Sequence, residues 1–236
     1  MIKPLEKLLD LIYPRRCPVC DGILSRGEKY FCKACCRDLS SVSEPYCMKC
    51  GKMLSAQENE YCGDCIIHAH NYDRGRSLLL YDEAIKKSLY RFKYSARKEY
   101  AESYAWLAEE KLGAFIREIN PDVLIPVPLH RRRRQKRGYN QAELFARALG
   151  RRMGIPVEAN LVKRVKNTVP QKELDLAARQ NNLKKAFKIR GNDVKLYTTI
   201  IIDDIYTTGS TIDALSEALR EAGARKIYFL TIAGGR

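Results

Sequence analysis

Four short apolar runs divide the chain beyond residue 75, and each is predicted to form a β-strand. They lie at Arg76–Tyr81, Asp122–Val127, Thr198–Ile202 and Lys226–Ile232. The third run reads TTIII, and a continuous run of β-branched residues is typical of a strand buried on both faces. The runs therefore predict a sheet at the centre of this part of the chain.

Amphipathic stretches separate the predicted strands. Apolar residues recur at helical spacing through Glu83–Ile119, and an interruption at Tyr94–Lys98 predicts two helices there. Further helices are predicted at Asn140–Arg152 and Thr211–Ala222. Because strands alternate with helices, the sequence predicts an α/β fold with a parallel sheet.

Polar residues at the starts of the last two helices are expected to cap them. Asn140 stands three residues before Glu143, and Ser210 stands three residues before Asp213. This spacing is typical of a capping box, in which the first side chain accepts a hydrogen bond from a free backbone N–H.

The first 70 residues differ from the rest, so two domains are expected, at 1–70 and 71–236, with a linker near residues 66–75. Met1–Tyr13 has helical apolar spacing but lacks the cleavage site of a signal peptide. No run of about 18 apolar residues is present, so no membrane span is expected and the cytoplasm is the expected location. Residues 166–185 form a long polar connection of the kind that often serves as a lid.

Nine cysteines occur, all before residue 66. Eight of them form CxxC pairs: Cys17 and Cys20, Cys32 and Cys35, Cys47 and Cys50, and Cys62 and Cys65. The pattern C-x2-C-x11-C-x2-C occurs twice, 30 residues apart, and paired thiolates at this spacing suit a tetrahedral ion. The repeat predicts two structural zinc sites in two ribbons, with Gly22, Gly51 and Gly63 expected to allow the turns beside the cysteines.

Disulfides and a redox CxxC are the alternatives to zinc. A chain without a signal peptide disfavours disulfides, and four CxxC pairs in a repeat are not the redox pattern. The pairs can combine sequentially or interleaved, and the spacing leaves this open. Cys36 is left over, and His68 and His70 are interpreted as ordinary surface residues because eight cysteines already complete two sites.

The segment Thr199–Thr211, with the sequence TIIIDDIYTTGST, carries the strongest chemical signal. A buried strand delivers Asp203 and Asp204 to the carboxyl edge of the sheet, where open α/β folds bind ligands. A short loop then enters a helix, whose free N–H groups favour an anion. The binding residues expected here are Asp203, Asp204, Tyr206, Thr207, Thr208, Gly209, Ser210 and Thr211.

Two other interpretations of the acidic pair are weaker. A Walker B strand of a nucleotide hydrolase requires an upstream GxxxxGK[ST] motif, which this sequence lacks. If the acidic pair were only a solvated strand end, the hydroxyl-rich loop that directly follows it would have no explanation. A sugar phosphate fits best, because carboxylates accept hydrogen bonds from ribose hydroxyls while the loop holds the phosphate.

The segment IDDIYTTGST resembles the motif that binds phosphoribosyl pyrophosphate (PRPP) in type I phosphoribosyltransferases. Nearly the whole chain resembles the ComF family, in its cysteine-rich start, FKY at Phe92–Tyr94, PVPLH at Pro126–His130 and RGYNQ at Arg137–Gln141. Tyr139 stands where the family often has phenylalanine. The resemblance implies a phosphoribosyltransferase fold that binds PRPP with Mg²⁺, in which Asp203 and Asp204 are the catalytic, ribose-binding acids.

The resemblance also implies a role in natural transformation, with single-stranded DNA and the DNA-uptake machinery as partners. The alternative is an active phosphoribosyltransferase of nucleotide or salvage metabolism. Charge fits a polyanionic partner, because +14 of the net charge of +15 falls in residues 71–236. Pyrophosphate release from PRPP distinguishes a transferase from a binding protein.

A basic run lies just after the second predicted strand. It consists of Arg131, Arg132, Arg133, Arg134, Lys136 and Arg137. One or two of these side chains suffice to bind a pyrophosphate. The remaining positive charge favours a longer polyanion such as DNA. The alternative is a basic loop without a specific ligand. Tyr139, Tyr90 and Phe92 are candidates for stacking on bases, although such positions more often belong to the core.

Overall fold

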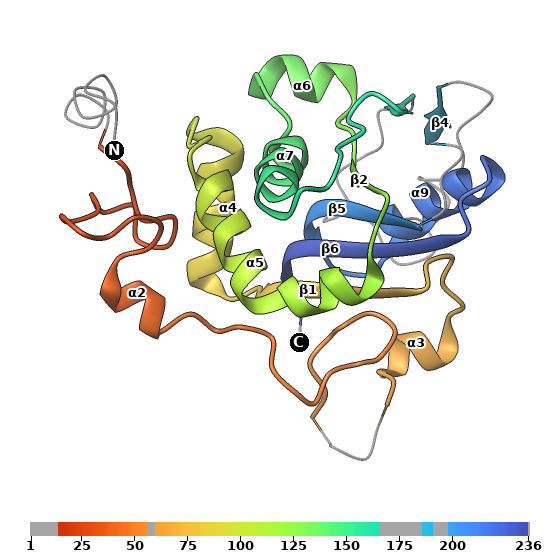
Figure 1. The fold of residues 1–236 in the computed structure, drawn as a ribbon, viewed down its shortest axis with the longest axis horizontal. Helices are drawn as coiled ribbons and strands as arrows, with labels where there is room; N and C mark the ends of the chain where they lie inside the picture. Colours follow the sequence, from red (N-terminus) through yellow and green to blue (C-terminus); the bar gives the residue numbers. More distant parts are fainter. Residues whose placement is uncertain (1–13, 56–59, 166–185, 191–197, 236) are drawn as a thin grey trace.

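The computed structural model describes residues 14–55, 60–165, 186–190 and 198–235. At its centre lies a sheet of four strands in the order β1-β6-β5-β2 (Figure 1). These strands are β1 (Arg74–Leu80), β2 (Val123–Pro126), β5 (Thr198–Tyr206) and β6 (Lys226–Gly234). Neighbouring strands pair in parallel, so the predicted parallel α/β fold is confirmed.

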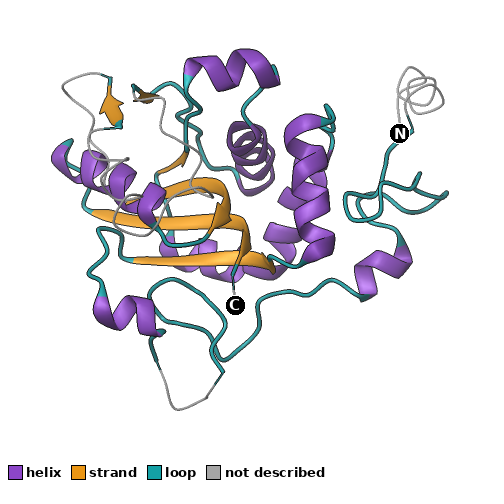
Figure 2. Ribbon diagram, turned by 180° about the vertical axis from the view of Figure 1, so that it is seen from behind, coloured by secondary structure: helices purple, strands orange, loops and turns teal. Residues whose placement is uncertain are grey.

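Helices cover both faces of this sheet (Figures 1 and 2). They are α4 (Glu83–Tyr94), α5 (Tyr100–Ile119) and α7 (Gln141–Met153) on one face and α9 (Ser210–Glu221) on the other. Successive side chains of a strand point to opposite faces, so Ile200 and Ile202 pack with α7 and its neighbours while Ile201 packs with α9. The predicted break between α4 and α5 is confirmed.

Shorter elements surround this core. They are α2 (Lys33–Arg37), α3 (Gly63–Ile67), α6 (Arg131–Arg137) and the antiparallel pair β3 (Val162–Arg164) and β4 (Phe187–Ile189). The predicted connection at residues 166–185 and the N-terminal segment Met1–Tyr13 lie outside the described residues.

One of the two predicted helix caps is confirmed. The side-chain oxygen of Asn140 accepts a hydrogen bond from the backbone N–H of Ala142 at 3.2 Å. The box of Ser210 and Asp213 is wrong, because Gly209, with φ of 77°, precedes α9 and Ser210 is already helical. The Asp213 carboxylate instead accepts a hydrogen bond from the backbone N–H of Asn71 at 2.9 Å.

The cysteine-rich segment contributes to both hydrophobic cores. Cys17 and Phe31 pack in the core with α4, α5 and α7, whereas Cys47 and Cys50 pack in the core with α9. Figures 1 and 2 show α2 and α3 far apart, at different ends of the molecule. The two halves of the cysteine repeat therefore contact different faces of the α/β fold.

Candidate functional site

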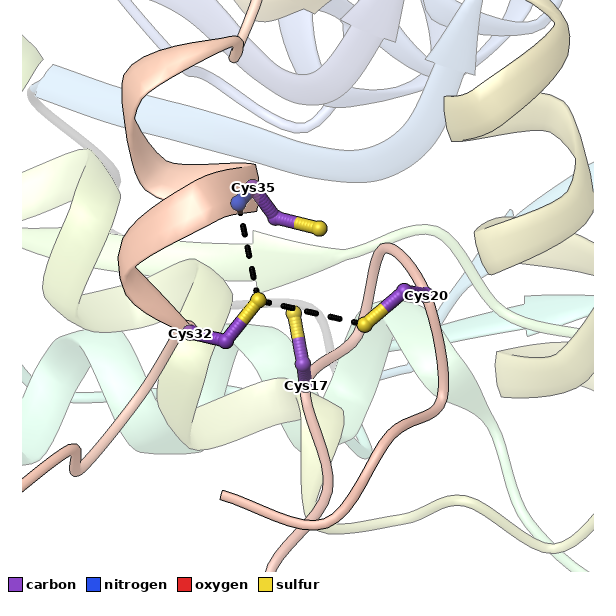
Figure 3. A group of neighbouring side chains, drawn as sticks. All are labelled: Cys17, Cys20, Cys32 and Cys35. Carbon is purple, nitrogen blue, oxygen red and sulfur yellow. Dashed lines mark hydrogen bonds between the residues drawn. The ribbon is translucent and has the colours of Figure 1, made fainter. Parts of the chain in front are cut away.

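The eight paired cysteines form two clusters. Cys17, Cys20, Cys32 and Cys35 form the first cluster, and Cys47, Cys50, Cys62 and Cys65 form the second. Within each cluster the four Sγ atoms lie within 4.8 Å of one another, and Figure 3 shows the thiols of the first cluster pointing toward one another. The pairs thus combine sequentially, which the spacing had left open.

The sulfur separations fit zinc. Tetrahedral Zn–S bonds of about 2.3 Å place sulfurs about 3.8 Å apart. The Sγ atoms of Cys20 and Cys32 are 3.9 Å apart, and those of Cys50 and Cys62 are 3.6 Å apart. Both clusters are therefore structural zinc sites with four ligands each.

Both clusters begin with the same turn. The backbone N–H groups of Asp21 and Gly51 donate to the carbonyls of Cys17 and Cys47, at 2.9 and 2.8 Å. Asp21 and Gly51 have φ of 62° and 70°, so the left-handed position of the first turn is Asp21 and not the predicted Gly22. Gly63 also lacks a positive φ, because it starts α3.

The residues left over from the clusters differ in their environment. Cys36 is exposed and, with His68 and His70, lies outside the two metal-ligand clusters found among the described residues. The interpretation of His70 as a surface residue is wrong, because its side chain is only 4% exposed. It is held by the Asp213 carboxylate, a contact between residues 143 positions apart that the local sequence does not indicate.

A cavity of about 520 Å³ opens at the carboxyl edge of the sheet, between the ends of β2 and β5. The chain after β2 leads to α7 on one face, and the chain after β5 leads to α9 on the other. Such a reversal leaves a crevice where open α/β sheets bind ligands. The charged residues lining it are Lys93, Arg133, Arg137, Arg164, Asp203 and Asp204.

Asp203 and Asp204 lie at the floor of the cavity, just beyond Ile202, the last residue of β5 that pairs with β2. Asp204 is buried, and its Oδ2 lies 2.6 Å from both Lys93 Nζ and Gln141 Nε2. Burial, together with the Asp204 charge, raises the pKa of Asp203 to about 7. The pair therefore combines a carboxylate held by a cation with one that is easily protonated.

The loop Thr207–Thr211, called the TTGST loop below, closes one side of the cavity. Thr207 and Thr211 line the cavity, while Gly209 and Ser210 line a small adjoining hollow at the start of α9. The first N–H groups of a helix have no partner within the helix, so this hollow suits an anion. A Cβ on Gly209 would lie 2.8 Å from Tyr206 Oη, so glycine is required for the tight turn.

Tyr206 and Thr208 are directed away from the main cavity. The buried Tyr206 ring stacks on Phe229 with centroids 4.7 Å apart, and its hydroxyl lies 2.7 Å from that of Tyr72. The Thr208 hydroxyl lies 2.9 Å from that of Ser210. The contacts of the Tyr206 side chain with Phe229 and Tyr72 thus anchor this residue, which directly precedes the loop.

The basic run forms the helix α6. His130 caps its start, and Gly138, with φ of 80°, ends it. Among the described residues, Arg133 and Arg137 are the members of the run that line the cavity, because residues four apart share one face of a helix. The other basic residues of the run are exposed: Arg131, Arg132, Arg134 and Lys136. One of them, Arg134, pairs with Glu143 at 3.4 Å.

Lys93, Gln141 and Arg164 line the cavity but were not predicted as site residues. Lys93 belongs to the FKY motif and Gln141 to the RGYNQ motif. The family resemblance therefore marked both positions, whereas their residue types alone did not indicate a site. Arg164 comes from β3. Burial lowers the pKa of its guanidinium group to about 10, although the charge of the nearby Asp203 acts in the opposite direction. Its proximity to the acids arises from the tertiary fold and has no local signature.

The suggested stacking residues divide into core and surface. Tyr139 and Phe92 are buried, and the Tyr139 hydroxyl donates to the Phe92 carbonyl, so their suggested role in stacking is wrong. Tyr90 is 63% exposed and lies beside Tyr94, which is 59% exposed, with ring centroids 5.0 Å apart. Arg137 lies 4.9 Å from the centre of the Tyr94 ring, so this exposed pair borders the cavity.

Comparison with protein families matches residues 8–66 to the double zinc ribbon domain. Competence protein F of Haemophilus influenzae is 42% identical over 109 residues, which cover 45% of this chain and 48% of that protein. DNA utilization protein YhgH of Salmonella typhi is 29% identical over 168 residues, 70% of this chain and 74% of that protein. The chain thus spans about half the length of the first relative.

Among solved structures, a purine phosphoribosyltransferase from Pyrococcus horikoshii covers 58% of this chain, with 25% identity and a TM-score of 0.36. The match covers 74% of that structure's chain. Within the described part of the chain, no helix has the length and apolar character needed to cross a membrane.

Proposed function

We propose that this chain, a protein of the ComF type with a double zinc ribbon and a phosphoribosyltransferase-like α/β fold, binds PRPP or another ribose 5-phosphate with Mg²⁺ in its cavity. The observation that carries the proposal is the position of Asp203 and Asp204 beside the TTGST loop. The acids accept hydrogen bonds from the ribose hydroxyls. The loop and the start of α9 hold the 5-phosphate through N–H and hydroxyl groups.

The cations that line the cavity suit a pyrophosphate. Arg133, Arg137 and Arg164 line the cavity, and guanidinium groups bind phosphate oxygens in a bidentate manner. Lys93 is already engaged with Asp204. Mg²⁺ neutralises part of the remaining ligand charge when it binds with PRPP. Because the cations that line the cavity outnumber its two acids, a ligand with several phosphates is favoured.

The arrangement of α6 provides a test with a matched control. Replacing both Arg133 and Arg137 with alanine removes two cavity cations and is expected to weaken PRPP binding at least tenfold. The double variant Arg131→Ala/Arg132→Ala removes the same charge from the exposed face and is expected to leave the affinity within about twofold. Isothermal calorimetry with PRPP and Mg²⁺ measures both. Equal affinities in the two double variants would contradict the proposed site.

We further propose that the protein acts in DNA uptake and binds single-stranded DNA. Two relatives are called a competence protein and a DNA utilization protein. The exposed basic face of α6 is suited to a phosphate backbone, and the adjacent Tyr90 and Tyr94 are suited to stacking on bases. A cytoplasmic location and contact with the uptake machinery belong to this proposal.

A second candidate function is transfer of the phosphoribosyl group. Tyr81, Tyr90 and Tyr94 line the cavity together with the two acids, which leaves aromatic surface for a planar acceptor. In such a reaction the bond from C1 to the pyrophosphate oxygen breaks and a bond from C1 to the acceptor forms. Pyrophosphate release measured with candidate bases and amines tests this candidate. Release that depends on the acceptor supports transfer, and its absence with bound PRPP favours a binding protein.

A further inference from the structure

The segment between α3 and β1 joins the second cluster to the site. His70 Nδ1 lies 2.7 Å from Asp213 Oδ2, and the backbone N–H of Asn71 donates to Asp213 Oδ1 at 2.9 Å. The Tyr72 hydroxyl lies 2.7 Å from the Tyr206 hydroxyl. Asp213 belongs to the first turn of α9, and Tyr206 directly precedes the TTGST loop. The segment therefore contacts residues on both sides of the loop in the chain, one just before it and one two positions after it.

Aromatic packing makes these contacts one unit. The His70 and Tyr72 rings are stacked with centroids 4.9 Å apart, and Tyr72 meets Phe229 edge-on at 4.8 Å. Phe229 in turn stacks on Tyr206. Tyr72, Tyr206 and Phe229 are all buried, so movement of one ring requires the others to repack.

The second cluster belongs to the same core. Cys47 and Cys50 pack in the hydrophobic cluster that contains Tyr72 and Tyr206. The backbone N–H of Gly75 donates to the Lys49 carbonyl, within the Cys47–Cys50 turn, at 2.8 Å. The turn that presents two of the thiols is therefore bonded to the strand that follows Tyr72.

The first cluster makes its contacts elsewhere. Asp21, in its first turn, accepts hydrogen bonds from Arg97 at 3.0 Å and Tyr100 at 2.6 Å. The Tyr30 ring stacks on Trp106 of α5, with centroids 5.1 Å apart. These contacts involve α5 and the connection that precedes it, on the opposite face of the sheet, so the first cluster provides an internal comparison.

We propose that the second cluster, through the positioning residues His70 and Tyr72, holds the TTGST loop in its binding conformation, so that phosphate binding and metal retention at this cluster are coupled. The inference deepens the proposed function and rests on it for the ligand. A loop fixed before binding loses less conformational entropy when the phosphate arrives. By thermodynamic reciprocity, a ligand that stabilises the loop also stabilises the metal-loaded cluster.

His70 has a second effect on the anion site. Asp213 places a carboxylate in the first turn of α9, close to the N–H groups proposed to hold the phosphate. His70 and Asn71 bind one oxygen each and direct the carboxylate toward the zinc ribbon. Without these partners the carboxylate is free to approach the same N–H groups and repel the ligand.

The contacts by which His70 and Tyr72 hold the TTGST loop are called the brace below. Hydrogen exchange tests the brace without any ligand. His70→Ala and Tyr72→Phe are expected to speed exchange of the backbone amides in the TTGST loop at least tenfold, measured by mass spectrometry on zinc-loaded protein. His70→Gln retains a donor for Asp213 and is expected to restore most of the protection. Tyr30→Phe, at the first cluster, is expected to leave loop exchange unchanged. Loop exchange like that of the parent in both His70→Ala and Tyr72→Phe would overturn the proposal.

Calorimetry with PRPP and Mg²⁺ separates this proposal from the proposed function. We expect His70→Ala to bind at least tenfold more weakly than the parent and His70→Gln to bind nearly as well. If the parent itself does not bind while loop exchange responds to His70→Ala, the proposed ligand is wrong and the brace stands. If the parent and His70→Ala bind equally well, the brace is wrong whatever the ligand does.

Zinc release to a chromogenic chelator provides the reciprocal measurement. PRPP with Mg²⁺ is expected to slow release of one zinc equivalent several-fold and to leave the other unchanged. The protected equivalent should lose its protection in Tyr72→Phe and keep it in Tyr30→Phe. Equal release of both equivalents with and without PRPP, in a parent that binds PRPP, would contradict the coupling.

Discussion

Replacing Gly209 with alanine is expected to damage the TTGST loop in two ways. Gly209 has φ of 77°, where a side chain is strained, and its added Cβ would lie 2.8 Å from Tyr206 Oη. That hydroxyl lies 2.7 Å from the Tyr72 hydroxyl. The substitution therefore strains the backbone and also displaces the ring that anchors the loop.

The structure sets the size of each effect. The left-handed conformation costs a non-glycine residue about 1–2 kcal/mol. Loss of the hydrogen bond between Tyr206 and Tyr72 adds about 0.5–1.5 kcal/mol. Gly209→Ala is thus expected to lower the free energy of unfolding by about 1.5–3.5 kcal/mol.

Gly154→Ala is the matched control. Gly154 follows α7 with φ of 70°, and a Cβ there meets nothing within 4 Å. Only the backbone strain remains, so the expected loss is about 1–2 kcal/mol. Urea denaturation measures both losses, and calorimetry is expected to show PRPP binding weakened at least tenfold in Gly209→Ala alone. Equal losses of stability, or PRPP affinity like that of the parent in Gly209→Ala, would refute the reasoning.

Three further outcomes are expected. Metal analysis should find two zinc equivalents in the full chain, and one or none would contradict the two four-cysteine sites. The pKa of Asp203 is raised to about 7 in the folded state, so its protonated form stabilises the fold fully below about pH 4, and this stability is lost as the pH rises to about 7. The urea midpoint of Asp203→Asn should not show this loss. Identical pH profiles of the parent and the variant would contradict the raised pKa. In fluorescence anisotropy with a labelled oligonucleotide, Arg131→Ala/Arg132→Ala should reduce the salt slope by about 1.4, and Tyr90→Ala/Tyr94→Ala should weaken binding without changing the slope. Slopes unchanged in the first variant would place the DNA elsewhere.

The sheet and the cysteine clusters were predictable because both depend on local patterns. The TTIII run identified β5, and the 30-residue repeat identified the eight ligand cysteines, although not how their pairs combine. The strand continues through Asp203 and Asp204 to Tyr206, farther than its apolar run, because pairing with β6 continues to Gly234. Hydrogen bonding between strands extends β5 where hydrophobicity no longer predicts it.

The parts that the sequence did not reveal depend on contacts between distant residues. Lys93 and Arg164 reach the acids from α4 and β3. Lys93 lies in the FKY motif of the family resemblance, whereas Arg164 has no local feature that predicts its position. His70 was misinterpreted because its partner, Asp213, lies in another element. The same contact explains the failed capping box, since Asp213 is engaged by the zinc-ribbon side of the molecule.

The most direct test of the account is a comparison of three ligands on the parent and on Asp203→Asn/Asp204→Asn. The acids are proposed to recognise ribose hydroxyls, and the TTGST loop to recognise the phosphate. Calorimetry should therefore show that the double variant binds PRPP and ribose 5-phosphate at least tenfold more weakly than the parent. Its affinity for inorganic phosphate should stay within about twofold, which also shows that the loop remains folded. Unchanged affinity for PRPP and ribose 5-phosphate in the double variant would contradict the ribose phosphate site.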